Sequence, residues 1–142
     1  MPRTAREKGM FQTYHVVQRG NNKEKVFAGN EEKYLFINIL AEARVKYGFF
    51  INAYCIMDNH YHLIINDNGQ DISKIMKDIN YKYAKYFNYI YKRSGHVFQE
   101  RFFSEIIDNT AYMHQVINYI HDNPVRAGIT KSREEYKWSS CQ

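Results

Sequence analysis

The hydrophobic and polar positions of this 142-residue chain follow two different periods, which alternate along the sequence. Runs rich in aromatic and β-branched residues, bounded by turn-forming residues, predict four strands at 14–19, 49–57, 60–66 and 101–108. Apolar residues spaced at i, i+3, i+4 and i+7 predict three helices at 31–47, 71–90 and 110–121.

The helix boundaries carry their own signals. Asn30 precedes two acidic residues and is expected to cap the first helix, which Gly48 ends. Asn109 or Thr110 is expected to cap the last one. The second helix has the clearest buried stripe, made of Ile72, Ile75, Met76, Ile79, Tyr83, Tyr86, Phe87 and Ile90.

The order of these elements predicts a fold class. Strand, helix, strand, strand, helix, strand is the split βαβ, or ferredoxin-like, arrangement of an α+β protein. It has an antiparallel sheet with two helices on one face, and an additional C-terminal helix follows here. Residues 14–142 are expected to form a single domain after a basic N-terminal arm at 1–13.

Composition narrows the range of partners. The net charge is +5, the sequence pI is near 9.1, and 13 tyrosines contribute to an aromatic fraction of 16%. A basic chain with many aromatic rings favours a polyanionic partner such as single-stranded nucleic acid. Two cysteines without a C-x-x-C pair favour a reducing cytoplasm, and neither a secretory signal nor a membrane-spanning run is expected.

One face of the second helix is basic. Lys74, Lys77, Lys85 and Lys92 follow one another along it, with Tyr81 and Asn88 between them. A solvated helix face is the simple interpretation. The alternative is a surface that follows a nucleic-acid backbone and offers a tyrosine for stacking.

Two histidines lie two residues apart in the third strand, within "MDNHYHLII". Alternate side chains of a strand share a face, so His60 and His62 point away from Tyr61, Leu63 and Ile65, which suit a core. Two imidazoles can bind one metal ion, but they need further ligands. Taken alone, the pair is more often structural.

The last helix offers further chemistry. Tyr119 and Asn123, four residues apart, border its apolar stripe on one side. At about 100° per residue, His121 points away from Tyr119, so the two cannot serve one site. A tyrosine can act as a covalent nucleophile, although core or surface packing is the usual role for any one of 13.

Several segments together resemble one family. "YHVVQRGNN", "MDNHYHLII", "GHVFQERFFSEII", "YIHDNPVRAG" and "YKWSS" are similar, in this order, to the single-tyrosine transposases of the HUH class. The likeness is greatest to the group associated with repetitive extragenic palindromes (REP), and it extends from about Tyr14 to Ser140. That family has a ferredoxin-like sheet, which agrees with the element order.

The resemblance implies a site and a reaction. His60 and His62 match the family's histidine pair, Tyr119 its nucleophile, and Asn123 the polar residue that completes the metal site. The expected cofactor is Mg²⁺, with Mn²⁺ also suited to imidazole ligands. The expected reaction cleaves and rejoins single-stranded DNA, at hairpin or palindromic sequences, through a 5′-phosphotyrosine intermediate.

Other functions stay open at this stage. The chain could be an inactive or domesticated module that only binds single-stranded nucleic acid, or a nickase of the replication or relaxase type. Expected phosphate contacts are Arg19, Lys74, Lys77, Lys85, Arg101 and Arg126, each of which could equally be an ordinary surface charge. A monomer is favoured over a homodimer.

Overall fold

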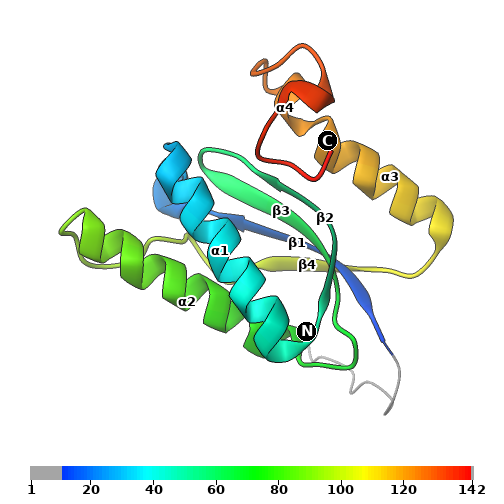
Figure 1. The fold of residues 1–142 in the computed structure, drawn as a ribbon, viewed down its shortest axis with the longest axis horizontal. Coiled ribbons are helices and arrows are strands. Elements are labelled where there is room, and N and C mark those ends of the chain that lie inside the picture. The colour runs from blue at the N-terminus through cyan, green and yellow to red at the C-terminus, as the bar shows by residue number, and fades with distance from the viewer. Residues whose placement is uncertain (1–10, 142) are drawn as a thin grey trace.

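The computed structural model describes residues 11–141, which form a four-stranded antiparallel sheet with helices on both faces (Figure 1). The spatial order is β2-β3-β1-β4. The strands are β1 (Thr13–Arg19), β2 (Phe50–Ile56), β3 (His60–Asn66) and β4 (Phe103–Ile107). The predicted α+β class, the antiparallel sheet and the order of elements along the chain are therefore confirmed, although the predicted strand at 101–108 is shorter at both ends.

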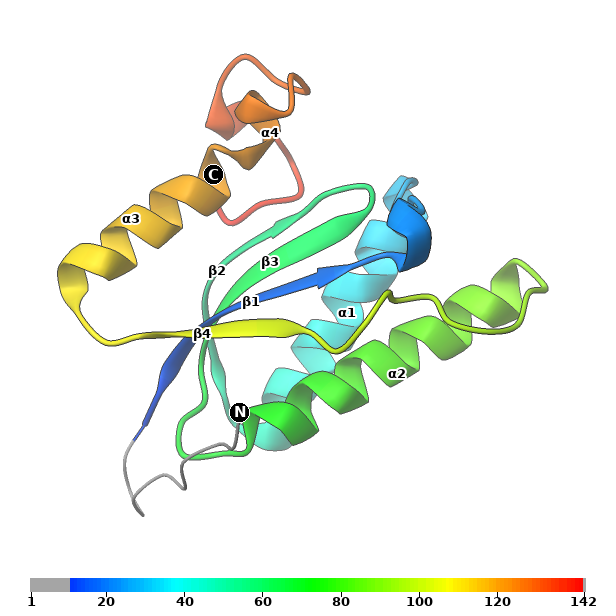
Figure 2. The ribbon, with the colours of Figure 1, turned by 180° about the vertical axis from the view of Figure 1, so that it is seen from behind.

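Helices α1 (Asn30–Tyr47) and α2 (Ile72–Ile90) cover one face of the sheet (Figure 2). Tyr61, Leu63 and Ile65 of β3 point toward them and are completely buried, as the alternation predicted. The aromatic rings of Phe27, Phe36, Tyr61 and Tyr83 pack against one another in this core.

Two details of the helix predictions are wrong. Asn30 is not a cap, because the helix begins at Asn30 itself after Gly29, and no side chain bonds to its first turn. Tyr86 and Ile90 are exposed, because the C-terminal end of α2 projects past the strands (Figure 2). At the start of α3, Asn109 is the cap: its side chain accepts a hydrogen bond from the amide of Tyr112.

The opposite face of the sheet is covered by α3 (Thr110–His121), which α4 (Asn123–Arg126) follows after Asp122 (Figures 1 and 2). Val116 and Ile120 of α3 are buried against the sheet. Pro124 occupies the first turn of α4, and proline has no backbone N–H with which to continue the hydrogen bonds of α3. Asn123 thus begins a new short helix instead of continuing α3.

Residues 136–140, here called the closing segment, attach to the β2 edge of the sheet. The amide of Ile56 donates a hydrogen bond to the carbonyl of Trp138 at 2.9 Å. The amide of Ser140 donates one to the carbonyl of Tyr54, also at 2.9 Å. The Tyr136 hydroxyl donates to the Ile56 carbonyl at 2.6 Å. Short 3-10 helices at Asn21–Lys23 and Arg133–Glu135 complete the described elements.

The basic arm predicted for residues 1–13 lies mostly outside the described residues, although its last residue, Thr13, opens β1. The described helices include none with the length and apolar character needed to cross a membrane.

Candidate active site

The two histidines of β3 point toward α3, on the face opposite the α1–α2 core. In the β1–β3 register, His60 lies opposite Arg19 and His62 opposite Val17. The two imidazole rings are 5.1 Å apart between centroids. Helix α3 covers much of this face, so His62 is only 4% exposed and His60 is half-buried.

His60 has a partner for each ring nitrogen. Its Nδ1 lies 2.7 Å from Asn59 Oδ1, an acceptor, so Nδ1 carries the proton and Nε2 keeps a free lone pair. Nε2 in turn lies 3.2 Å from the side-chain amide of Asn123. A half-turn of that amide presents oxygen in place of nitrogen. Burial, reinforced by Arg19, lowers the pKa of His60 to about 4, so the ring is neutral.

His62 is held by a third histidine that the sequence analysis missed. Its Nδ1 lies 3.0 Å from Nε2 of His15 on β1, and the two rings stack at 5.2 Å. Burial and the neighbouring imidazoles lower the pKa of His62 to about 2, and burial also lowers that of His15. His15 is separated from His62 by 47 residues, so only the strand register reveals the pair.

Tyr119 of α3 faces the histidines. Its ring centroid is 5.8 Å from that of His62, and its side chain is 52% exposed. The Arg126 guanidinium lies 4.0 Å over the Tyr119 ring and donates a hydrogen bond to the Tyr119 carbonyl. His121 turns away, as expected, and its Nε2 lies 2.8 Å from Ser140 Oγ of the closing segment.

A cavity of about 350 Å³ opens beside Tyr119. It lies between β1, β4 and α3. Its lining residues are His15, Phe103, Glu105, Tyr112, Gln115, Val116 and Tyr119. The Tyr112 hydroxyl donates a hydrogen bond to the Glu105 carboxylate, and this bond joins α3 to β4. An extended polymeric ligand could therefore approach Tyr119 from the solvent side.

The donor set suits a cation with several open coordination positions. Within residues 11–141, no three His, Cys, Asp or Glu side chains gather as a metal site. Two neutral imidazoles and one amide do converge, from β3 and the start of α4. Neutral imidazole is the form that binds metal, and Asn59 fixes the His60 tautomer as outer-shell partners of metal ligands do.

The predicted phosphate contacts lie in several different places on the surface. Arg126 lies over Tyr119, while Arg19 and Arg101 line a small cavity of about 240 Å³ beside β4. Lys77 and Arg101 share a larger cavity next to α2. Lys74 and Lys85 belong to other surface hollows of α2, away from the tyrosine.

Comparison with known proteins places this geometry in a family. Residues 10–123 match the family described as "Transposase IS200 like". A search of curated proteins found no match.

Two solved structures are similar in fold. One is a REP-associated tyrosine transposase bound to a REP hairpin, at 23% identity and a TM-score of 0.74; the match covers 99% of this chain and 82% of that one. The other is a Deinococcus radiodurans R1 protein named as a candidate transposase, at 16% identity and a TM-score of 0.59, covering 85% and 97%. With the family match over most of its length, the chain belongs to the IS200-like transposases.

Proposed function

We propose that this protein cuts and rejoins single-stranded DNA with Tyr119 as the nucleophile and with His60, His62 and Asn123 as ligands of one divalent cation. One observation carries the proposal. Segments separated by about 60 residues bring a half-exposed phenol, two neutral imidazoles and an amide to one place. Family membership supports a strand-transfer reaction, and the hairpin-bound neighbour supports a DNA substrate with a stem-loop.

The reaction can be written for the atoms involved. The Tyr119 phenol loses its proton as its oxygen bonds to phosphorus, and the bond from phosphorus to the 3′ oxygen breaks. The departing 3′ oxygen takes up a proton, and the 5′ side stays linked to the tyrosine. A 3′ hydroxyl can later reverse the exchange without ATP, because the phosphotyrosine keeps a phosphodiester bond.

The protein's own groups have separate tasks in this scheme. Arg126 holds the Tyr119 ring from above, and His15 and Asn59 orient the two imidazoles. A divalent cation at this site, Mg²⁺ or Mn²⁺, supplies polarisation of a phosphoryl oxygen.

The test is a covalent adduct between protein and DNA. A hairpin-bearing single-stranded oligonucleotide, incubated with Mg²⁺ or Mn²⁺, should give a species of raised mass that survives a denaturing gel. Tyr119→Phe should abolish the adduct and leave binding of the oligonucleotide nearly unchanged, and Tyr112→Phe is the matched control. An undiminished adduct in Tyr119→Phe would refute the proposed nucleophile, and chelation of the metal should stop the wild-type reaction.

A further inference from the structure

The turn between β2 and β3 carries His60 into the candidate site. Asp58 and Asn59 form this turn, and the amide of Met57 donates a hydrogen bond to the carbonyl of His60 across them at 2.8 Å. Tight hairpin turns that match the twist of a sheet need a left-handed backbone at one or both central residues. Neither Asp58 nor Asn59 has a positive φ. The conformation of this turn therefore depends on contacts from outside it.

Two backbone hydrogen bonds hold the turn from one side. The amide of Phe27 donates to the carbonyl of Asp58, and the amide of Gly20 donates to the carbonyl of Asn59, each at 2.8 Å. Both donors belong to the segment between β1 and α1. These bonds fix the path of the backbone, but neither involves a charged group.

A buried lysine near the start of α1 provides a third contact. Lys33 is 4% exposed, and it is the only buried lysine or arginine among residues 11–141. Its Nζ donates hydrogen bonds to the carbonyls of Phe27 and Ala28, at 2.6 and 3.3 Å, and to Asp58 Oδ1 at 2.8 Å. These three acceptors use all three N–H groups of the ammonium. Because a buried charge is costly to leave unpaired, the Asp58 side chain is strongly held at this position.

From the turn, the chain of contacts continues to a proposed metal ligand. Asn59 Oδ1 lies 2.7 Å from His60 Nδ1, and this contact selects the tautomer whose Nε2 lone pair faces Asn123. The contact joins neighbouring residues, so it depends on the backbone conformation of the turn. Lys33 fixes Asp58, and Asp58 is covalently bonded to Asn59. The buried ammonium is therefore linked to the orientation of the imidazole.

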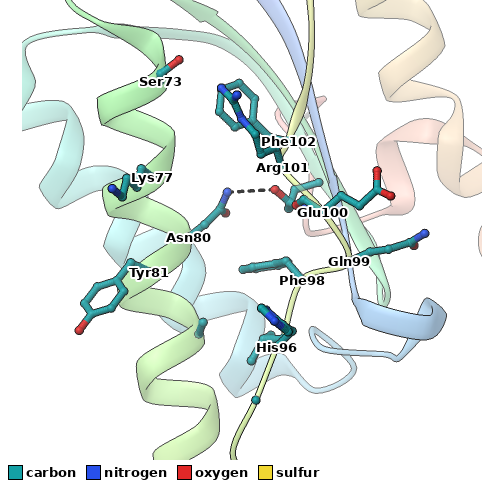
Figure 3. Close-up of a pocket in the computed structure, with 14 residues that line it drawn as sticks. Ser73, Lys77, Asn80, Tyr81, His96, Phe98, Gln99, Glu100, Arg101 and Phe102 are labelled. Carbon is teal, nitrogen blue, oxygen red and sulfur yellow. Dashed lines mark hydrogen bonds between the residues drawn. The ribbon is translucent and has the colours of Figure 1, made fainter.

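The next residue of β3 is anchored separately. Tyr61 points to the other face of the sheet, and its hydroxyl donates a hydrogen bond to Asn80 Oδ1 at 2.6 Å. Figure 3 shows Asn80 on α2, in the cavity of about 720 Å³ between that helix and residues 95–102. From Asn80 the hydrogen bonds continue through Gln18 to Glu100, away from the turn. A change at Asn80 thus disturbs β3 beside His60 without touching the turn.

We infer that Lys33 is a positioning residue of the metal site, which acts through Asp58 on the turn that orients His60; this inference rests on the proposed function. Lys33 donates no hydrogen bond to a proposed metal ligand itself. Without the ion pair, the turn keeps its two backbone bonds but Asn59 is held less firmly. His60 then spends more time in the tautomer whose Nε2 carries the proton, which cannot bind a cation. The expected result is a weaker affinity for the cation.

The first measurement needs neither metal nor DNA. Imidazole nitrogen shifts from long-range proton–nitrogen NMR, on protein treated with chelator at neutral pH, distinguish the two tautomers, and His60→Gln assigns the signal. The wild type should carry the proton of His60 on Nδ1. Asp58→Ala should give a mixture of tautomers. Asp58→Asn keeps an oxygen acceptor for Lys33 and should retain the wild-type signal, as should the control Asn80→Ala.

The second measurement is the affinity for Mn²⁺ without DNA, from the electron paramagnetic resonance signal of free Mn²⁺. His60→Gln should abolish the binding, which assigns it to this site. Lys33→Met and Asp58→Ala should each raise the dissociation constant about tenfold, the level at which outer-shell partners act. The double variant should also lose about tenfold, because the two residues act in one chain, whereas independent effects would multiply to about 100-fold. Asn80→Ala should change the constant by less than about twofold.

Adduct formation then separates positioning from folding. Asp58→Ala should need about tenfold more Mn²⁺ for its half-maximal rate, and at saturating Mn²⁺ its rate should be within about twofold of the wild type. A variant that had only lost folded protein would have a lower maximal rate in proportion. Circular dichroism confirms that each variant is folded.

Three results would each overturn the inference: a wild-type tautomer and Mn²⁺ affinity in Asp58→Ala, an equal loss in Asn80→Ala, or a loss in Asp58→Asn as large as in Asp58→Ala. The proposed function has a separate readout. If Mn²⁺ binding depends on His60 but not on Lys33 or Asp58, only the inference fails. If Mn²⁺ binding does not depend on His60, the proposed metal site fails, and the inference fails with it.

Discussion

The two faces of β3 have opposite compositions, although they alternate along one strand of seven residues. Tyr61, Leu63 and Ile65 are completely buried against α1 and α2, where the packing is aromatic and aliphatic. His60 and His62 face α3, where their neighbours are imidazoles and amides. The first face is hydrophobic, whereas the second combines the two histidines with Ile64, which is also completely buried.

This contrast teaches that half of the candidate site is built on an interior strand anchored by the core. A ligand that alternates with core residues in a central strand cannot shift without moving the core. Tyr119 lies instead on α3, which packs on the sheet with only two fully buried side chains. The histidines are therefore the fixed half of the site, and the tyrosine is the half with more freedom.

Replacing a core residue gives the largest expected effect on stability. Leu63→Ala should lower the free energy of unfolding by about 3 kcal/mol, because it leaves a cavity in a fully buried position. Urea unfolding measures this change. Below the unfolding transition, the rate of adduct formation per folded molecule should match that of the wild type; a loss of rate without unfolding would contradict the separation of the two faces.

Replacing the adjacent histidine should have the opposite result, with a large loss in the rate of adduct formation and a small loss of stability. His62→Asn is expected to slow adduct formation about 100-fold, because a proposed metal ligand is lost. It should lower the free energy of unfolding by only about 1 kcal/mol, the cost of disturbing the bond to His15. The rate is measured on a denaturing gel over time. If His62→Asn unfolds like Leu63→Ala, the histidine face is part of the core.

Acid should destabilise the folded protein partly through His60. The unfolded chain binds protons at His60 below pH 6.5, while the folded ring stays neutral down to about pH 4. Stability should therefore fall as the pH drops from 6.5 to 4, by about 2 kcal/mol for His60 after allowing for its partial exposure. Urea unfolding with chelator across this range should show a weaker pH dependence in His60→Gln; parallel curves would argue against the buried neutral ring.

The smallest predicted effect concerns the orientation of His60. Asn59→Ala removes the acceptor at His60 Nδ1 and should slow adduct formation about tenfold, since outer-shell partners of metal ligands contribute at this level. Asn59→Asp keeps an acceptor and should retain most of the rate. Equal losses in the two variants would point to the turn conformation instead of the hydrogen bond.

The sequence allowed one face of β3 to be predicted better than the other. Strict alternation fixed the core positions Tyr61, Leu63 and Ile65, because burial follows period two wherever one face is apolar. The pairing of His15 with His62 could not be predicted, since it depends on how β1 aligns with β3. The end of α3 at His121 was predicted, but the relation between Tyr119 and Asn123 was not, because Asn123 begins the separate helix α4 and does not continue α3.

For α2 and the cavity beside it, too, the periodic pattern of the sequence predicted only part of the structure. Helical period predicted its buried stripe correctly as far as Tyr83 and Phe87, and failed for Tyr86 and Ile90, where no sheet remains to cover them. The cavity beside α2 has its second wall in residues 95–102, which have almost no regular structure and therefore no periodic pattern. Irregular segments reveal their contacts only in three dimensions.

The closing segment has a consequence for the order in which the molecule matures. Its hydrogen bonds join residues 80 or more positions apart, such as Tyr136 with Ile56 and Ser140 with Tyr54, and contacts of such separation form late. His121 docks on the same segment, two residues after the tyrosine. During synthesis we therefore expect the sheet to assemble first, and the closing segment with the His121 contact to dock on it last.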